Sequence, residues 1–194
     1  MRVLHLYCHP LPESFHAGIK AAAQDGLAKA GHEVDLLDLY AEGFQPVLGE
    51  EERRRYHEPG HRPPDMEPYI DRLRRAEALV VQFPTWCFGP PAMLKGFLDR
   101  VMLPGVAFDI SNPDRVRPML QHIRKVAGIV TYGGRRLHAF WMGDPPRKVV
   151  TRYLRWFAAP RAPVSYYALY HMNMADDARR RQFIADVGTA MERF

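Results

Sequence analysis

The first segment that could carry chemistry spans residues 9–16 and reads H-P-L-P-E-S-F-H. It leads from an apolar run into a helical pattern, so its backbone N–H groups can converge on a phosphate at the start of that helix. Ser14 can donate to such a phosphate or simply cap the helix. The segment contains neither the G-K-S/T of a P-loop nor G-x-G-x-x-G, so neither of those phosphate loops is present.

A second segment, residues 84–91, reads P-T-W-C-F-G-P-P and places aromatic side chains in a proline-rich loop. The neighbouring strand and helix already supply core residues, so Trp86 and Phe88 exceed what the core needs. An aromatic ledge beside backbone donors suits a flat heteroaromatic ligand. The alternative is that both rings pack beneath the loop or in a dimer interface.

A third segment, residues 131–134, reads T-Y-G-G. Paired glycines directly after a strand allow a close approach between the backbone and a ligand. A plain tight turn is the alternative. The prediction of a binding site therefore depends on whether the three segments meet in space.

Apolar periodicity predicts the elements that would position these segments. Strands are expected at residues 3–7, 33–39, 78–83, 125–131 and 164–169. Helices are expected near residues 19–30, 68–75, 91–101, 149–157 and 183–194. Residues 40–65 have no clear periodicity and are expected to form a long loop that is functional or mobile.

Strands that alternate with helices predict a three-layer α/β fold with helices on both faces of a parallel sheet. Right-handed crossovers favour the strand order 2-1-3-4-5, and residues 1–194 are expected to form one domain. In such a sheet, ligands bind at the carboxyl ends of the strands, where the strand order reverses. This rule brings the loops after the first, third and fourth strands together.

Composition narrows the class of protein. The 194 residues carry a formal charge of +5, but the basic residues form scattered clusters without interleaved aromatic residues, which argues against nucleic-acid binding. No apolar run is long enough for membrane insertion, and the N-terminus does not resemble a signal peptide, so a cytoplasmic protein is expected. Cys8 and Cys87 form neither a C-x-x-C pair nor a zinc spacing, so no metal site is expected.

The chain resembles the NAD(P)H:quinone oxidoreductases of flavodoxin-like fold, the DT-diaphorase type with its bacterial relatives. The resemblance covers about the first 135 residues and is densest where the chain reads Q-F-P-T-W-C-F-G-P-P-A-M-L-K-G-F-L-D-R-V. D-L-Y with Phe44 and Pro46 matches the pattern after the family's second strand, and T-Y-G-G matches its T-x-G-G. The resemblance implies a flavodoxin-like fold, a bound flavin, and hydride transfer from NAD(P)H to a quinone-like acceptor by a ping-pong mechanism.

The resemblance also implies roles for particular residues. The phosphate end of the flavin would be held by His9, Ser14, Phe15 and His16. Its ring would be bordered by Pro84, Thr85, Trp86, Cys87 and Phe88, and on the other edge by Thr131, Tyr132, Gly133 and Gly134. FMN is expected rather than FAD, because the chain is compact and the region after Gly134 is short. A homodimer with shared active sites is expected from the same resemblance.

The sequence departs from the family's pattern at three places, and these departures bear on the specificity for the hydride donor and acceptor. His16 stands where the family commonly has Asn, and Cys87 stands where it usually has Trp, which removes one wall of the ring site. After Gly134 the sequence does not align with the family's hydride-transfer Tyr and His, so Tyr132 and His138 are local catalytic candidates.

Other functions stay open from the sequence alone. A flavin-binding ancillary subunit with little turnover and an azo- or flavin reductase of the same superfamily are both compatible with these motifs. A one-electron flavodoxin is disfavoured, because such carriers are typically acidic whereas this chain has a sequence pI near 9.4.

Overall fold

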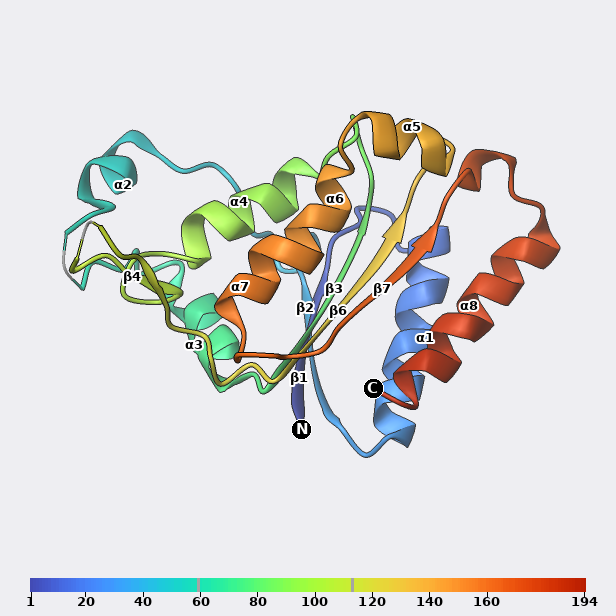
Figure 1. The fold of residues 1–194 in the computed structure, drawn as a ribbon, viewed down its shortest axis with the longest axis horizontal. Helices are drawn as coiled ribbons and strands as arrows, with labels where there is room; N and C mark the ends of the chain where they lie inside the picture. Colours follow the sequence, from blue (N-terminus) through green and yellow to red (C-terminus); the bar gives the residue numbers. More distant parts are fainter. Residues whose placement is uncertain (59, 113) are drawn as a thin grey trace.

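Five parallel strands form the centre of the structure, a computed structural model that describes residues 1–58, 60–112 and 114–194. The strands are β1 (Arg2–Tyr7), β2 (Glu33–Asp38), β3 (Ala78–Pro84), β6 (Lys125–Thr131) and β7 (Val164–Leu169). Their order is β2-β1-β3-β6-β7, which confirms the predicted order 2-1-3-4-5 (Figure 1). The three-layer flavodoxin-like α/β fold is therefore confirmed.

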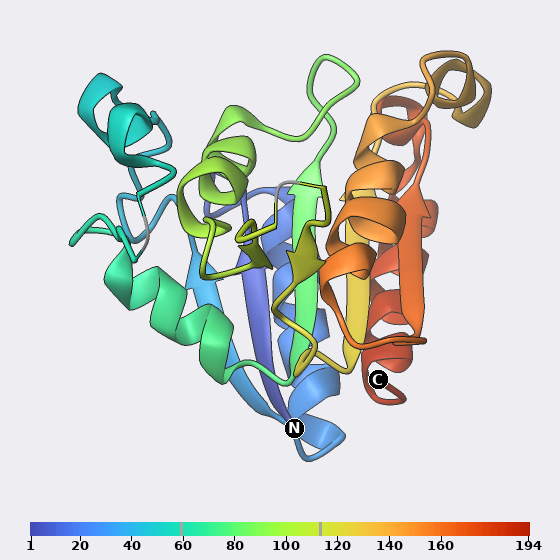
Figure 2. The ribbon, with the colours of Figure 1, turned by 60° about the vertical axis from the view of Figure 1, so that its left-hand side comes forward.

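Helices cover both faces of this sheet (Figures 1 and 2). α1 (Phe15–Lys29) and α8 (Asp177–Met191) lie on one face, where Ile19, Leu27 and Val187 pack against Val80 and Ile129. The other face is covered by α3 (Glu67–Arg75), α4 (Ala92–Val101) and the helical segment at residues 145–157. Because both faces are covered, β3 is buried along its whole length, which explains its nearly continuous apolar sequence.

The helical segment at residues 145–157 is longer and less regular than the predicted helix at 149–157. It begins as α6 (Pro145–Lys148), widens into the π-helical turn η1 (Val149–Leu154) and ends as α7 (Arg155–Phe157). Three further helical elements were not predicted: α2 (Glu50–Arg55), α5 (Arg136–Trp141) and the short 3-10 turn η2 (Met172–Met174). A two-stranded hairpin of β4 (Phe108–Asp109) and β5 (Arg117–Pro118) was also missed.

The segment at residues 40–65, expected to be a long loop, contains the short helix α2 (Glu50–Arg55). The buried guanidinium of Arg100 in α4 anchors it. Arg100 donates to the backbone oxygen of Gln45 at 2.6 Å and to the carboxylates of Glu52 at 2.9 Å and Asp65 at 2.8 Å. Within the part of the chain that the structure describes, no helix is long and apolar enough to cross a membrane.

Two glycines of α1 allow a matched test of how α1 packs against α8. A Cβ at Gly26 would overlap the backbone oxygen of Gly188 and approach the Cβ of Met191 to 2.9 Å, whereas a Cβ at Gly18 would meet only the end of the Ile184 side chain at 3.3 Å. Alanine gains about 1 kcal/mol of helix propensity over glycine at either position. Gly18→Ala should therefore leave the free energy of unfolding unchanged or raise it.

Gly26→Ala should lower the free energy of unfolding by about 1–3 kcal/mol, because the two helices must separate to make room for the methyl group. Urea unfolding monitored by circular dichroism would measure both variants. Equal stability of Gly26→Ala and Gly18→Ala would show that α8 moves without cost.

Candidate functional site

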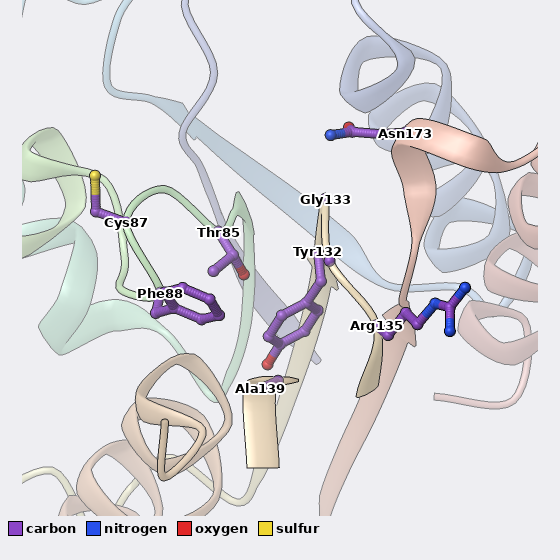
Figure 3. A pocket seen from close by; sticks show the side chains of 9 residues that line it. Thr85, Cys87, Phe88, Tyr132, Gly133, Arg135, Ala139 and Asn173 are labelled. Atoms are coloured by element: carbon purple, nitrogen blue, oxygen red, sulfur yellow. The ribbon is translucent and has the colours of Figure 1, made fainter. Parts of the chain in front are cut away.

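The three segments singled out from the sequence meet at one edge of the sheet. They follow the carboxyl ends of β1, β3 and β6, where ligands bind in open parallel sheets. A cavity of about 210 Å³ lies between the second and third segments (Figure 3). Its walls are formed by Thr85, Cys87, Phe88, Tyr132, Gly133, Gly134, Arg135, Ala139 and Asn173.

Six of the predicted site residues line this cavity: Thr85, Cys87, Phe88, Tyr132, Gly133 and Gly134. Other predicted residues lie around it rather than in its wall: His9, Ser14, Phe15, His16, Pro84, Trp86, Thr131 and His138. His138 is exposed on α5. Sequence reasoning missed Ala139 and Asn173, which come from α5 and from the loop after β7; Arg135, the N-cap of α5, also lines the cavity.

The first segment turns from β1 into α1 at Ser14. The Ser14 side-chain oxygen accepts a hydrogen bond from the Ala17 N–H at 3.2 Å, so Ser14 is an N-cap. His9 lies at the surface of the same segment, with its ring stacked on His16 at a centroid distance of 5.4 Å. The first N–H groups of a helix have no partner within the helix, so this turn offers donors to an anion.

His16 points inward and is 2% exposed, so it belongs to a chain of buried polar side chains. Gln82 donates its amide N–H to the His16 backbone oxygen at 2.7 Å and lies 3.3 Å from His16 Nδ1. The Gln82 carbonyl oxygen must therefore face His5 Nε2, 3.1 Å away, and it accepts from that nitrogen. His16 Nε2 lies 2.7 Å from the hydroxyl oxygen of Thr131.

These contacts fix the direction of each hydrogen bond. Because His16 Nδ1 faces the donating Gln82 amide, the His16 proton sits on Nε2 and is donated to Thr131. The Thr131 hydroxyl oxygen therefore accepts the hydrogen bond from His16. The proton of the Thr131 hydroxyl is then free to be donated to another group. Burial lowers the pKa of His5 to about 4 and that of His16 to about 3, so both rings are neutral near pH 7.

The second segment contains a strained turn. Cys87 and Phe88 have φ values of 49° and 58°, and Trp86 and Gly89 exchange backbone hydrogen bonds of 3.0 and 2.9 Å around them. Consecutive left-handed residues form the type I′ turn, which favours Asn and Gly. Non-glycine residues held in this conformation cluster at functional sites. The turn presents Trp86 and Phe88 to solvent, where they are 42% and 41% exposed.

Thr85 supplies a free polar group at the base of this turn. Its backbone N–H donates to the Thr131 carbonyl at 2.8 Å, which joins the second and third segments. Its hydroxyl oxygen is buried and has no hydrogen-bond partner among the described residues. Figure 3 shows Thr85 between Phe88 on one side and Tyr132 on the other. A buried hydroxyl without a partner is costly, so this group suits a polar atom of a ligand.

The third segment is held against the loop that follows β7. A Cβ at Gly133 would come within 2.9 Å of the Asn173 side-chain nitrogen, so only glycine allows this approach. The backbone N–H of His171 donates to the Gly134 carbonyl at 2.7 Å, and that of Met172 donates to the Tyr132 carbonyl at 2.9 Å. The paired glycines thus bring the backbone close to Asn173 beside the cavity.

The Tyr132 hydroxyl is already engaged in a polar cluster behind the cavity. It donates to the Asp144 carboxylate at 2.6 Å and also contacts the Tyr166 hydroxyl. Its ring stacks on Tyr170 at a centroid distance of 4.3 Å. Burial, together with Tyr166, raises the pKa of Tyr132 well above its usual range, so its phenol stays protonated.

No group of three or more His, Cys, Asp or Glu side chains able to hold a metal ion occurs in residues 1–58, 60–112 and 114–194. The wall of the first cavity offers hydroxyl, amide, thiol, guanidinium and aromatic groups together with the backbone. These groups suit a planar polar ring and its phosphate.

Comparison with known proteins agrees with this architecture. The chain matches the family described as Flavodoxin-like fold over residues 1–186 and belongs to that family. It is 34% identical over 125 residues to the human ribosyldihydronicotinamide dehydrogenase (quinone), a match that covers 56% of this chain and 54% of that protein. The chain thus spans about half the length of the curated relatives it matches.

Two solved structures are similar over nearly the full chain. A protein of Streptococcus mutans superposes with a TM-score of 0.88 and 31% identity over 100% of both chains. The NAD(P)H:quinone oxidoreductase of Methanothermobacter marburgensis superposes with a TM-score of 0.84 and 25% identity over 99% of this chain and 98% of that one.

The buried histidines predict how stability depends on pH. Because the pKa values of His5 and His16 are lowered in the folded state, the unfolded chain binds more protons below its histidine pKa of about 6.5. Stability should therefore fall as the pH drops from 7 to 5, by about 2 kcal/mol for each of the two imidazoles.

Urea unfolding at pH 7 and pH 5 would measure this loss, and His16→Gln should remove about half of the two-histidine effect. His57→Gln is the matched control, since it removes an exposed imidazole from outside this chain of hydrogen bonds. If His16→Gln keeps the full wild-type pH dependence, the buried chain of hydrogen bonds does not set the stability at acid pH.

Proposed function

We propose that this chain is a flavin-dependent oxidoreductase that takes hydride from NAD(P)H and reduces a quinone-like acceptor. The observation that carries the proposal is the cavity at the carboxyl ends of β3 and β6, with an aromatic wall and the unpartnered Thr85 hydroxyl at its base. Membership of the flavodoxin-like family and the likeness to NAD(P)H:quinone oxidoreductases support the same reading.

The residues at this edge fit a flavin. The start of α1, with His9, Ser14, Phe15 and His16, would hold the phosphate end through backbone N–H groups. Pro84 to Phe88 would border one edge of the ring, and Thr131 to Gly134 would border the other. The Thr85 hydroxyl lacks a partner and would meet a polar atom of the ring. We propose FMN rather than FAD, because these loops form a compact site and none of the residues assigned to the flavin is assigned to an adenine ring.

When bound, a flavin supplies two-electron hydride chemistry between NAD(P)H and the acceptor. The residues that line the cavity would position the reactants and shield the covered side of the flavin from water. Phe88 and Trp86 offer half-exposed rings at the entrance, against which a flat substrate can stack. With the flavin held in the cavity of about 210 Å³, the two substrates would use the same place at its entrance in turn, which is the basis of the proposed ping-pong cycle.

Tyr132 and His138 stay the proposed catalytic residues, and the geometry separates their roles. The Tyr132 phenol is protonated and donates to Asp144. Its hydroxyl is therefore occupied, and Tyr132 would position the reactants with its ring, which lines the cavity. His138 lies exposed on α5, with its side chain in contact with solvent. Turnover that is unchanged in both Tyr132→Phe and His138→Ala would remove these residues from the mechanism.

A homodimer is proposed from an apolar groove between α4 and the helical segment at 145–157. The groove encloses about 720 Å³, and its lining includes Leu98, Met142, Tyr153 and Trp156. Trp156 is 45% exposed and Met142 is 56% exposed, a surface that a second copy would cover. Light scattering of the purified protein at micromolar concentration would give the mass that tests this arrangement.

The visible spectrum of the purified protein tests the central proposal. Protein mixed with FMN and then desalted should retain the absorbance of a bound flavin, and this absorbance should bleach with NAD(P)H under anaerobic conditions. A quinone should restore the absorbance, and steady-state kinetics should give parallel lines. Protein that fails to retain FMN or FAD would refute the proposal.

Thr85→Val separates ligand binding from folding. The change removes a buried hydroxyl that has no partner among the described residues, so the cofactor-free protein should be as stable as the wild type or more stable. The affinity for FMN should fall about fivefold, which is the usual effect of one lost hydrogen bond. Fluorescence titration would measure affinity, and thermal unfolding would measure stability.

Thr151→Val is the matched control, because the Thr151 hydroxyl lies outside the first cavity and donates to the Arg147 carbonyl at 2.8 Å. An unchanged FMN affinity in Thr85→Val would place the flavin away from this hydroxyl.

A further inference from the structure

A second cavity lies on the other side of α5 from the first. It encloses about 430 Å³ and is lined by Arg136, Phe140, Gly143, Asp144, Arg147, Lys148, Thr151 and Arg152. Half of these residues are cations, and they come from two helical segments that are separated by the turn at Gly143 and Asp144. The cavity therefore concentrates positive charge in a concave surface.

None of these four cations forms an ion pair within 4 Å among the described residues. Two arginines that are more buried than these four are paired: Arg72 contacts Asp35 at 2.7 Å, and Arg100 contacts Glu52 at 2.9 Å. Lys148 and Arg152 lie four residues apart in one helical segment, an arrangement of like charges that destabilises a helix. Arg147 lies over the Tyr166 ring, 5.1 Å from its centroid, so packing accounts for one of the four cations and leaves Arg136, Lys148 and Arg152 without such a contact among the described residues.

Asp144 is the single carboxylate in the cavity wall, and its oxygens are already engaged. One oxygen accepts from the Tyr132 hydroxyl at 2.6 Å, and the other accepts from the Tyr170 hydroxyl at 3.3 Å. Its position is fixed by the cap it provides to the backbone N–H of Arg147. Four cations against one carboxylate leave a net charge of +3 on the wall.

The two cavities share their dividing wall. α5 and its N-cap contribute Arg135 and Ala139 to the first cavity, and Arg136 and Phe140 to the second. Tyr132 lines the first cavity, and its hydroxyl bonds to Asp144 in the wall of the second. A ligand longer than the first cavity could therefore extend over α5 into the second.

We propose that the second cavity binds the phosphate groups of the reducing dinucleotide and makes the protein select NADPH over NADH. The proposal rests on the proposed function, because the nicotinamide ring would stack beside the flavin at the mouth of the first cavity. The 2′-phosphate of NADPH adds about two negative charges, and phosphates are strongly bound by unpaired arginines. A wall with four cations therefore gains more from NADPH than from NADH.

Isothermal titration calorimetry with the flavin-loaded protein tests the proposal, using NADP⁺ and NAD⁺ as non-reacting probes. At low salt, NADP⁺ should bind at least about tenfold more tightly than NAD⁺. This ratio should shrink in 0.5 M NaCl, because screening weakens contacts to exposed charges. Equal affinities for the two probes at low salt would overturn the proposal.

The double variant Lys148→Gln/Arg152→Gln should reduce the NADP⁺ to NAD⁺ affinity ratio to about twofold, since it removes half of the cations. Both side chains are exposed in the single chain, but they also line the groove proposed as the dimer interface. Circular dichroism would verify the fold of the variant, and light scattering would verify that it keeps the wild-type mass. Arg136→Gln, on the other helix, should lower the ratio by a smaller factor.

The matched control Arg75→Gln/Arg193→Gln also removes two exposed charges, but near the opposite edge of the sheet, where β3 begins and the chain ends (Figure 1). It should leave the ratio unchanged. A wild-type ratio that persists in Lys148→Gln/Arg152→Gln, or that falls equally in the control, would overturn the assignment to this cavity.

The same samples separate the two proposals. Protein that oxidises NADH and NADPH with equal kcat/KM and binds both probes equally supports the proposed function and overturns the phosphate site. Protein that prefers NADP⁺ through Lys148 and Arg152, but reduces no quinone with either dinucleotide, supports the phosphate site and overturns the proposed function. Inorganic phosphate should compete with NADP⁺ in either case, and the absence of competition at 50 mM would overturn the site.

Discussion

The hydrogen bonds of one buried amide, that of Gln82, hold the loops of the site together. Gln82 lies in the central strand β3 with no exposed surface, so each of its polar atoms needs a partner inside the fold. It finds them in His5 of the neighbouring strand and in the first turn of α1. Through His16 the same chain reaches Thr131, at the end of β6. The start of α1 is thereby fixed relative to the two central strands.

This constraint explains why His16 is a structural residue rather than a wall of the cavity. A neutral imidazole can accept on one nitrogen and donate on the other, so it spans the distance between Gln82 and Thr131. A shorter amide side chain at this position could not be expected to bridge both groups in the same way. An Asn, which is common at this position in the family, would therefore have to hold the turn in a different way. In this protein, the buried His16 orients the Thr131 hydroxyl.

The parts of the fold that follow from local pattern could be predicted from the sequence, and the parts that depend on distant partners could not. Apolar runs predicted the central strands β3 and β6, because strands buried on both faces can tolerate few polar residues. The edge strands β2 and β7 are only half-buried and were predicted from shorter apolar stretches. The anchoring of residues 45–65 depends on Arg100, whose partners lie 35 to 55 positions away in the sequence. No local periodicity reports such a contact, so α2 was missed.

The same difference between local pattern and distant contacts explains which site residues could be predicted. The loops after β1, β3 and β6 were found because topology alone places them at one edge. Asn173 was missed because it belongs to the loop after β7, and its approach to the cavity depends on the missing side chain of Gly133. The cations at 147, 148 and 152 were passed over because the sequence shows them dispersed, and only the helical segment collects them.

The π-helical turn η1 links the core to that surface. On its inner side, Val150 and Leu154 are buried, and Val150 lies so close to β6 that a Cβ at Gly128 would come within 2.7 Å of it. On its outer side, Lys148 and Arg152 line the second cavity. Side chains four residues apart lie on one face of a helix, so the segment that contains this π-helical turn keeps both apolar residues inward and both cations outward. Such turns are uncommon and concentrate at functional sites, which is consistent with a segment shaped for its outer face as well as for the core.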